Sequence, residues 1–330
     1  MTKNFYMFTN GKIKRKDNTL RVISDEKGSR DLQYEVLEDI YLFGETEMNT
    51  NLLNFISRRG IMIHIFNHYG FYSGSFVPRE RQVSGFLLVD QVNHYSDAEK
   101  RLILAKKFVE AAACNIYRNL RYYDEREREV EEVMKEIQSL TKQIPNADSI
   151  ASLMGIEGNI RKKYYSVWEK IIKADVEFEK RVKQPPDNIV NTLISFINSL
   201  VYTTALSEIY KTQLNPTVSY LHEPGTKRFS LSLDLAEIFK PLIAERMIFS
   251  MLNKRQITES DFERESNFLY LKEGGKRKIL EEYEKRLART IRHKDLGREV
   301  SYRYLFRLEC YKLIKHLIGE KEYEGFKIWW

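Results

Sequence analysis

Residues 1–91 carry short apolar and aromatic stretches bounded by turn-forming residues, a pattern that predicts β-strands. The dipeptide Asn10-Gly11 favours the tight turns of antiparallel strands, so it predicts a hairpin between residues 5–8 and 20–23. Further strands are predicted at residues 39–43, 61–66 and 71–77. The N-terminal part is therefore expected to be a small β-rich domain.

Apolar residues at helical spacing first occur at residues 50–57, which predicts a short helix within the β-rich part. From residue 92 onward this spacing dominates, and Ser96 with Glu99 forms a capping-box pattern ahead of the first long helix. Later helices are predicted at residues 125–140, 148–172, 188–214, 233–252, 259–270, 276–290 and 301–319. We therefore predict an α+β fold with two domains, a β-rich domain over residues 1–91 and a larger all-helical domain over residues 92–330.

The composition is that of a soluble globular protein, because 42% of the residues are hydrophobic and 31% are charged. No apolar run approaches the roughly 20 residues that span a bilayer, and the first residues lack a secretory signal. We therefore expect a cytoplasmic protein without a membrane segment. Cys114 and Cys310 lie too far apart in sequence to suggest a zinc spacing or a disulfide framework. The formal charge of +7 favours a nucleic-acid partner only slightly.

One imidazole and two carboxylates lie close together in sequence, at His222, Asp234 and Glu237. If a helix begins near residue 233, the two acids share one of its faces, and His222 reaches them from the preceding loop. A set of nitrogen and oxygen donors suits Mn²⁺ or Mg²⁺ better than a structural zinc ion. The alternative is that both acids lie on a solvated helix face, where most surface carboxylates are found.

A third acid, Glu157, lies between two glycines in a predicted helix. Glycine costs about 1 kcal/mol in a helix interior relative to alanine, so Gly155 and Gly158 need a reason. Either something approaches the backbone closely here, with Glu157 pointing into a cleft, or two helices cross tightly with Glu157 at the rim. The residues alone do not decide between these two interpretations.

Several motifs occur together in one order along both halves of the chain. They are Gly155-Ile156-Glu157-Gly158-Asn159, Pro185-Pro186-Asp187 with Asn191, and Leu221-His222-Glu223 followed by Leu233-Asp234-Leu235-Ala236-Glu237-Ile238-Phe239-Lys240-Pro241. In this order the chain resembles the CRISPR adaptation integrase, the metal-dependent nuclease and integrase that inserts new spacers into CRISPR arrays. That family also has a β-rich N-terminal domain followed by a larger helical catalytic domain. Lys240 stands where the family often has arginine, which leaves the placement of DNA open.

The resemblance implies a Mn²⁺ or Mg²⁺ ion held by Glu157, His222 and Glu237. Asp234 matches a further acidic position, where it is expected to orient a ligand, bind water or assist proton transfer. The implied reaction is a transesterification that joins the 3′-hydroxyl of a prespacer to a phosphodiester at the CRISPR repeat, with DNA cleavage as a related activity. The rival interpretations are a non-catalytic nucleic-acid scaffold and a phosphohydrolase that acts on nucleotides.

Two groups of basic residues are candidates for DNA contact. The first follows Glu157 by one turn, and the second recurs at a spacing of three residues and predicts a basic ridge along a helix. For the second group, the alternative is that these residues lie on the solvated face of an amphipathic helix and do not contact DNA. The residues are Arg161, Lys162 and Lys163 in the first group, and Arg286, Arg289 and Arg292 in the second.

The resemblance also implies partners. The family forms homodimers, and a small CRISPR adaptation protein bridges two of them. We expect the β-rich domain to supply much of the homodimer contact. The surface that meets the small partner is not assigned, and the C-terminal residues 326–330 are one candidate.

Overall fold

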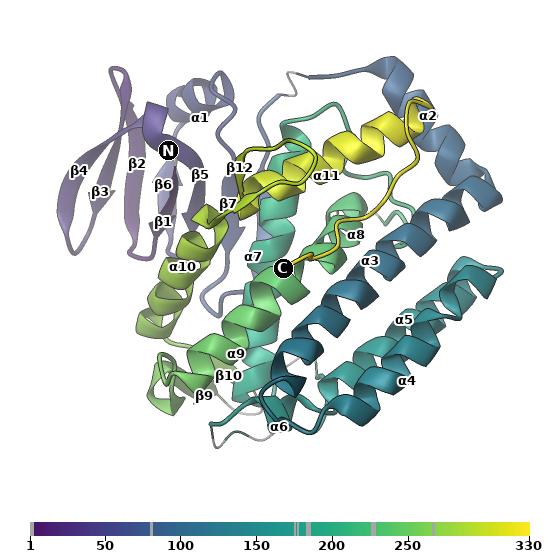
Figure 1. Ribbon diagram of the computed structural model, residues 1–330. Helices are drawn as coiled ribbons and strands as arrows, with labels where there is room; N and C mark the ends of the chain where they lie inside the picture. Colours follow the sequence, from purple (N-terminus) through teal and green to yellow (C-terminus); the bar gives the residue numbers. More distant parts are fainter. Residues whose placement is uncertain are drawn as a thin grey trace.

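Two four-stranded sheets form the N-terminal part of the protein, and helices form most of the rest, in a computed structural model (Figure 1). The structure describes residues 3–79, 82–174, 176, 178–182, 186–225, 229–265 and 268–330. The first sheet has the strand order β1 (Lys3–Met7), β5 (Leu37–Leu42), β7 (Ile63–Phe66) and β8 (Tyr72–Phe76). The second sheet has the order β4 (Gly28–Gln33), β3 (Thr19–Ser24), β2 (Gly11–Lys16) and β6 (Thr46–Met48).

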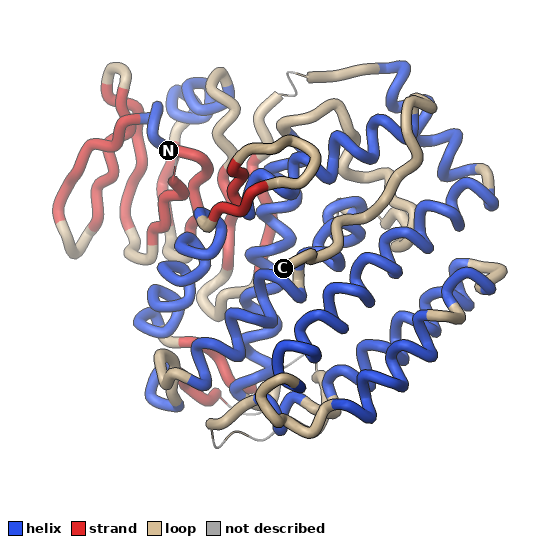
Figure 2. Tube along the Cα trace, viewed as in Figure 1, coloured by secondary structure: helices blue, strands red, loops and turns tan. Residues whose placement is uncertain are grey.

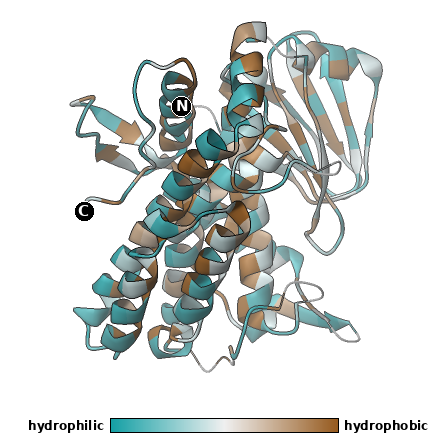
Figure 3. Ribbon diagram, turned by 90° about the vertical axis from the view of Figure 1, so that its right-hand side faces the viewer, coloured by the Kyte–Doolittle hydropathy of each residue, from teal (hydrophilic) through white to brown (hydrophobic). Residues whose placement is uncertain are grey.

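Helices follow the sheets, and the long, mostly buried helix α7 (Ile189–Tyr210) lies among them (Figures 1 and 2). They are α2 (Gly85–Ser96), α3 (Ala98–Asp124), α4 (Glu131–Thr141), α5 (Ile150–Tyr165), α6 (Trp168–Ile171), α7 (Ile189–Tyr210), α8 (Ser230–Phe239), α9 (Arg246–Asn253), α10 (Glu273–Ala288) and α11 (Tyr302–Leu317). Figure 3 shows hydrophobic and hydrophilic residues interleaved along most of these helices, as expected where one face is buried. The predicted α+β fold class is confirmed. The predicted boundary between residues 91 and 92 falls inside α2, and the division into two domains stays a prediction.

The first sheet separates two hydrophobic cores. Side chains alternate between the faces of a strand. Ile40 and Leu42 of β5 therefore belong to a small core built by both sheets and α1 (Thr50–Ser57), whereas Tyr41 belongs to the large core of the helices. Ile63 and Phe66 of β7 divide in the same way. One sheet thus serves both cores and joins the N-terminal part to the helices.

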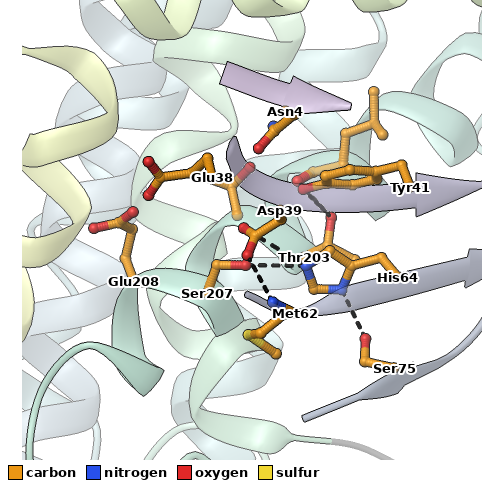
Figure 4. Close-up of polar contacts among 12 residues, drawn as sticks. Asn4, Glu38, Asp39, Tyr41, Met62, His64, Ser75, Thr203, Ser207 and Glu208 are labelled. Atoms are coloured by element: carbon orange, nitrogen blue, oxygen red, sulfur yellow. Dashed lines mark hydrogen bonds and ion pairs between the residues drawn. The ribbon is translucent and has the colours of Figure 1, made fainter. Parts of the chain in front are cut away.

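A buried polar cluster lies where this sheet meets α7 (Figure 4). The ring of His64 on β7 bonds the Ser75 hydroxyl through Nδ1 at 2.7 Å and the Ser207 hydroxyl through Nε2 at 3.0 Å. Asp39 lies beside the ring and accepts a hydrogen bond from the backbone N–H of Met62 at 3.2 Å. Both His64 and Asp39 are fully buried. The cluster fastens α7 to the sheet by a hydrogen bond between two buried side chains, His64 and Ser207.

Helix α7 is long and apolar enough to cross a membrane, judged by length and composition alone. Within the fold, 78% of its most apolar window is buried, as in the core helix of a soluble protein. Its Glu208 is fully buried and forms ion pairs with Lys211 at 2.9 Å and with Arg307 at 2.8 Å. We expected no apolar run long enough to span a bilayer, and α7 is the exception among the described residues by length and composition.

The predicted hairpin at Asn10-Gly11 is wrong. Gly11 begins β2, and the strand before it, β1, pairs in parallel with β5. The hairpin joins β2 to β3 through Asp17 and Asn18, and Asp17 has a φ of 51°, a value that Asp tolerates better than most residues. A side chain at Gly11 would put its Cβ only 2.1 Å from the carbonyl oxygen of Ile23. The glycine is therefore needed for close strand approach.

Two helix predictions also need correction. Asp97, not Ser96, caps α3, because its carboxylate accepts hydrogen bonds from the N–H groups of Glu99 and Lys100, both at 3.0 Å. The helix predicted over residues 259–270 is instead an antiparallel pair of strands, β9 (Phe262–Glu265) and β10 (Phe268–Leu271). Residues 263–265 are all exposed and charged, so no continuous apolar helix face exists there.

The C-terminal tail, residues 321–330, packs back onto the helices. Phe326 and Ile328 are buried, whereas Trp330 is 42% exposed. Asn115 of α3 holds the tail, since it donates to the carbonyl of Phe326 at 3.0 Å and accepts from the N–H of Ile328 at 2.8 Å. Most of the apolar surface of residues 326–330 is therefore already covered by the chain itself.

Candidate functional site

His222 and Asp234 form a tightly bonded pair. Asp234 on α8 is fully buried, and its carboxylate accepts hydrogen bonds from the backbone N–H groups of Tyr220 at 2.7 Å, Leu221 at 3.0 Å and His222 at 3.0 Å. The Nδ1 atom of His222 lies 2.8 Å from the same carboxylate. Because the carboxylate is already an acceptor for three donors, Nδ1 is expected to carry the proton. Nε2 of a neutral His222 is then left as an acceptor or metal ligand.

Burial lowers the pKa of His222, but the hydrogen bond and charge of Asp234, with the charge of Glu237, outweigh it. The pKa of His222 therefore lies above its ordinary value. Glu237, whose charge contributes to this rise in pKa, lies on the helix that carries Asp234. Two of the acids predicted from the sequence thus accompany the histidine.

Arg161 gathers three glutamates. Its guanidinium lies 3.2 Å from Glu157, 2.5 Å from Glu237 and 2.6 Å from Glu245. Lys240 forms a second ion pair with Glu237. Burial alone would raise the pKa of Glu237, but Lys240 and Arg161 outweigh it and lower that pKa to about 2. Glu237 is therefore held ionised at neutral pH.

A π-helical turn, Pro241–Glu245, explains how Glu237 and Glu245 reach the same arginine. Eight residues along a regular helix leave two side chains about 80° apart. The N–H of Glu245 bonds the carbonyl of Lys240, five residues back, at 3.0 Å, so the turn absorbs one extra residue. Pro241 has no N–H and cannot continue the ordinary ladder. Sequence reasoning missed Glu245, although Pro241 in a helical pattern was the available signal.

The residues around Glu157 leave open space. Gly155 and Gly158 on α5 are exposed, and a Cβ added at either would meet nothing within 4 Å. The tight helix crossing proposed as one reason for these glycines is therefore absent in the described structure. The side chain of Glu157 is 20% exposed, so the surface beside it is accessible.

The donor chemistry fits a divalent cation, since one imidazole nitrogen and two carboxylates lie in one neighbourhood. The carboxylates are at present engaged by Arg161 and Lys240, whose positive charges lie where a cation would act. Among the described residues, no three His, Cys, Asp or Glu side chains already converge in a metal-binding arrangement. A metal at Glu157, His222 and Glu237 therefore requires these ion pairs to rearrange.

The two basic groups are placed differently from the sequence-based expectation. Arg161 is largely buried and its donors face glutamates, so its charge is used inside the protein. Lys162 is exposed, whereas Lys163 is paired with Glu136 at 2.7 Å. The DNA contacts of these two lysines remain predictions.

The basic ridge expected at Arg286, Arg289 and Arg292 does not exist as one helix face. Arg286 is buried on α10, Arg289 follows the end of that helix, and Arg292 lies on β11 (Thr290–Arg292). Strand β11 pairs with β12 (Glu299–Ser301), and this hairpin replaces the last predicted turn of helix.

The Pro185-Pro186-Asp187 motif precedes α7, and Pro185 lies outside the described residues. The side-chain amide of Asn191 donates a hydrogen bond to the Asp187 carboxylate at 2.8 Å.

Comparisons with known proteins give one consistent result. The family model described as "CRISPR associated protein Cas1" matches residues 5–285. A CRISPR-associated endonuclease Cas1 of Fusobacterium nucleatum is 54% identical, and the match covers 100% of this chain and 98% of that protein. The Clostridium perfringens protein of the same name is 50% identical over the full length of both chains.

Solved structures agree. A CAS1 protein from Thermotoga maritima has a TM-score of 0.89 at 39% identity, covering 99% of this chain and 100% of that one. A casposase bound to an integration product shares the fold, with a TM-score of 0.87 at 22% identity over 98% of this chain and 93% of that one. The chain therefore belongs to the Cas1 family of CRISPR-associated endonucleases.

Proposed function

We propose that this protein is a metal-dependent DNA endonuclease and integrase of CRISPR adaptation that acts in the cytoplasm. Its reaction joins the 3′-hydroxyl end of a prespacer to a phosphodiester at the CRISPR repeat. The observation that carries the proposal is the His222–Asp234 pair, in which Nδ1 faces the buried carboxylate while Nε2 has no hydrogen-bond partner among the described residues. A buried carboxylate that orients a histidine in this way is typical of metal sites.

Glu157, His222 and Glu237 are the residues that would hold Mn²⁺ or Mg²⁺. When bound, such an ion stabilises negative charge on phosphate oxygens and favours a deprotonated attacking oxygen. Asp234 keeps His222 in one tautomer and one orientation. The Glu237 carboxylate is already ionised, so it would bind a cation without first losing a proton once its ion pairs with Arg161 and Lys240 open. The open surface at Gly155 and Gly158 lets a DNA strand come close to Glu157.

The reaction needs no nucleotide cofactor. The prespacer 3′-oxygen forms a bond to a phosphorus atom of the repeat as the bond from that phosphorus to the neighbouring 3′-oxygen breaks. The proton lost by the attacking hydroxyl is balanced by the proton taken up by the leaving oxygen. One phosphodiester replaces another, so the chain needs only to position and stabilise the exchange.

The test is strand transfer into a supercoiled plasmid that carries a CRISPR repeat, with Mn²⁺ or Mg²⁺ and the small adaptation partner present. We expect Glu157→Ala, His222→Ala and Glu237→Ala each to lower joining by at least about 100-fold, because each removes a metal ligand. Circular dichroism controls for folding. A folded parent protein that binds DNA but never joins or cuts it would leave a non-catalytic scaffold as the better interpretation.

The proposed assembly is a homodimer, with two dimers bridged by a small CRISPR adaptation protein. A Cas6-RT-Cas1–Cas2 complex shares the fold, with a TM-score of 0.86 at 17% identity, which is a likeness of fold alone. The dimer contact is proposed to come from the β-rich part, where Val36 is 50% exposed. Sedimentation tests this: Val36→Asp should weaken the dimer, and Val89→Asp on α2, 57% exposed in the parent, should not. A dimer that resists the first change and yields to the second would move the contact to the helices.

A further inference from the structure

A pocket of about 540 Å³ is lined by residues from the C-terminal ends of α3, α6 and α10 and by residues along α9. We call it the basic pocket, and Arg126, Arg246, Lys254, Arg286 and Arg289 are among its lining residues. Its volume lies in the range of pockets that bind small molecules. Glu157, His222 and Glu237 do not line it. It is therefore separate from the proposed metal centre.

The charge of the basic pocket is strongly one-sided. Seven arginine and lysine side chains line it, and its described lining contains no aspartate or glutamate. Outside this lining, Glu282 lies 3.6 Å from both Arg286 and Arg289. One carboxylate at this distance cannot neutralise seven cations. The pocket therefore has a positive potential that attracts anions.

Arg286 is the buried cation of the pocket. Its side chain is 5% exposed, and its Nε atom is buried without a hydrogen-bond partner in the described structure. Its Nη1 atom makes only a long contact of 3.4 Å, with the carbonyl of Leu242. Burial, with the nearby charge of Arg289, lowers the pKa of Arg286 to about 10. A buried guanidinium with an unused donor is costly, and an anion would supply the missing acceptor.

Arg246 is held in position by the fold. Its Nε atom donates to the Asn119 side chain at 2.6 Å, and Asn119 in turn donates to the carbonyl of Pro241 at 2.8 Å. Asn119 and Arg246 both line the pocket. Such a chain of hydrogen bonds presets the guanidinium, so little entropy is lost when it binds an anion.

An aromatic surface lies beside these cations. Tyr122 lines the pocket and is 48% exposed. The guanidinium of Arg126 lies over its ring at 3.6 Å from the centroid. A stacked arginine and tyrosine next to a phosphate-seeking group is the combination used to hold a base and its phosphate together.

We propose that the basic pocket binds the phosphate of a nucleotide unit, with Arg246, Arg286 and Arg289 on the phosphate and Tyr122 beside the base. A DNA strand and a free nucleotide both carry this group. If the phosphate belongs to a DNA strand, the proposal rests on the proposed function. If it belongs to a free nucleotide, the proposal stands independently of that function. Arg246 directly follows Glu245, which faces Arg161, so the pocket and the metal centre lie on two sides of one turn of chain.

The test measures binding by the full-length protein in metal-free buffer, so that phosphodiester transfer cannot contribute. The probes are inorganic pyrophosphate, deoxythymidine monophosphate and a 5′-phosphorylated oligo(dT) of a few nucleotides. The variants are Arg289→Gln and Lys254→Gln at exposed positions, and Arg286→Gln at the buried one. Arg121→Gln is the matched control, because Arg121 is exposed on α3 beside Tyr122 but does not line the pocket.

We expect each pocket variant to weaken binding of the phosphate probes by about tenfold, with a shallower dependence on salt, and the control to change it little. Tighter binding of the oligonucleotide than of the mononucleotide identifies a DNA strand as the source, and equal binding identifies a free nucleotide. If Arg289→Gln and Lys254→Gln bind every probe as the parent does, the proposal is overturned. The binding result for Arg286→Gln is used only if this variant shows a cooperative thermal unfolding transition, because Arg286 is buried. Loss of strand transfer with phosphate binding intact would count against the metal centre and not against the pocket.

Discussion

His64 and His222 are both polar groups beside an aspartate, yet their surroundings differ in one decisive way. His64 is fully buried, and both of its ring nitrogens bond serine hydroxyls at the joint between β7 and α7 (Figure 4). The His222 side chain is 19% exposed, and among the described residues only its Nδ1 atom has a partner, the buried Asp234. A histidine whose two nitrogens are satisfied holds elements together. A histidine with one nitrogen satisfied and one free is available for chemistry.

The surroundings also move the two pKa values in opposite directions. Burial lowers the pKa of His64 to about 4, and Asp39, 4.0 Å away, does not compensate. At His222 the hydrogen bond and charge of Asp234 outweigh burial and raise the pKa. The distance and contact of the neighbouring carboxylate therefore separate the structural histidine from the one proposed to act in catalysis.

The largest effect in this comparison is expected from a change at Asp234, the carboxylate that distinguishes His222 from His64. Asp234→Asn removes the charge that orients His222 and places an amide where backbone N–H groups point. We expect strand transfer to fall by about 10- to 100-fold, as for other residues that orient metal ligands. The ¹⁵N chemical shifts of the imidazole report the tautomer directly. An unchanged Nδ1–H tautomer with full activity would contradict the role given to Asp234.

The next effect sharpens the comparison at His64 through pH. Below roughly pH 6.5 an unfolded histidine binds a proton, while the folded His64, with its lowered pKa, does not. Its contribution to stability is therefore complete above about pH 6.5 and is lost as the pH falls toward 4. Between pH 7 and pH 5 the protonation of unfolded His64 should lower the free energy of unfolding by about 2 kcal/mol. Urea unfolding of the parent and of His64→Gln measures it, and equal losses in both would refute it.

A third effect concerns the cation that neutralises Glu237. Lys240→Gln removes an ion pair from that carboxylate, so a divalent ion would no longer compete with the lysine for it. We expect Mn²⁺ to bind about tenfold more tightly, as seen by electron paramagnetic resonance of the free ion. Lys142→Gln, at the exposed end of α4, is the charge-matched control. Unchanged Mn²⁺ affinity in Lys240→Gln would mean that Glu237 is not a ligand.

The smallest effect compares two helical glycines. Gly155→Ala should raise the free energy of unfolding by about 0.5 to 1 kcal/mol, because its Cβ meets open space and alanine favours the helix. Gly275→Ala should do the reverse, since its Cβ would lie 2.8 Å from the carbonyl oxygen of Asp261. Thermal unfolding checks both. If Gly155→Ala is more stable but transfers DNA more slowly, the open surface serves the substrate.

Local patterns predicted much of the fold. The helix over residues 50–57 is found as α1 with the same bounds, because its apolar spacing and the Asn49 cap act within one short segment. The prediction of a hairpin at Asn10-Gly11 was wrong because the strand before this turn, β1, pairs with β5, which lies more than thirty residues further along the chain. The hairpin forms instead between β2 and β3, and a local turn signal does not reveal this choice of partner. The basic ridge failed because a hairpin after Arg289 cannot be seen in charge spacing.

The candidate site was predictable only in part. The sequence placed Asp234 and Glu237 on one helix face with His222 in the preceding loop, and the flanking glycines singled out Glu157. The resemblance then joined Glu157, His222 and Glu237 as one set of metal ligands. The convergence of Glu157, Glu237 and Glu245 on Arg161 depends on a π-helical turn, and a local sequence pattern does not specify that geometry. Tertiary packing, not composition, turned Arg161 from an expected DNA contact into an internal counter-ion.

The way Asn115 holds the C-terminal tail has a mechanical consequence for the proposed metal site. Its amide also donates to the carbonyl of Ile238 at 3.0 Å, so one side chain ties α3, the helix of Asp234 and Glu237, and the last residues of the chain together. The position of the helix that carries the proposed ligands therefore depends on a contact with residues 326–328, which lie far from it along the chain. A change that loosened this tail would reach the proposed site without touching any of its residues.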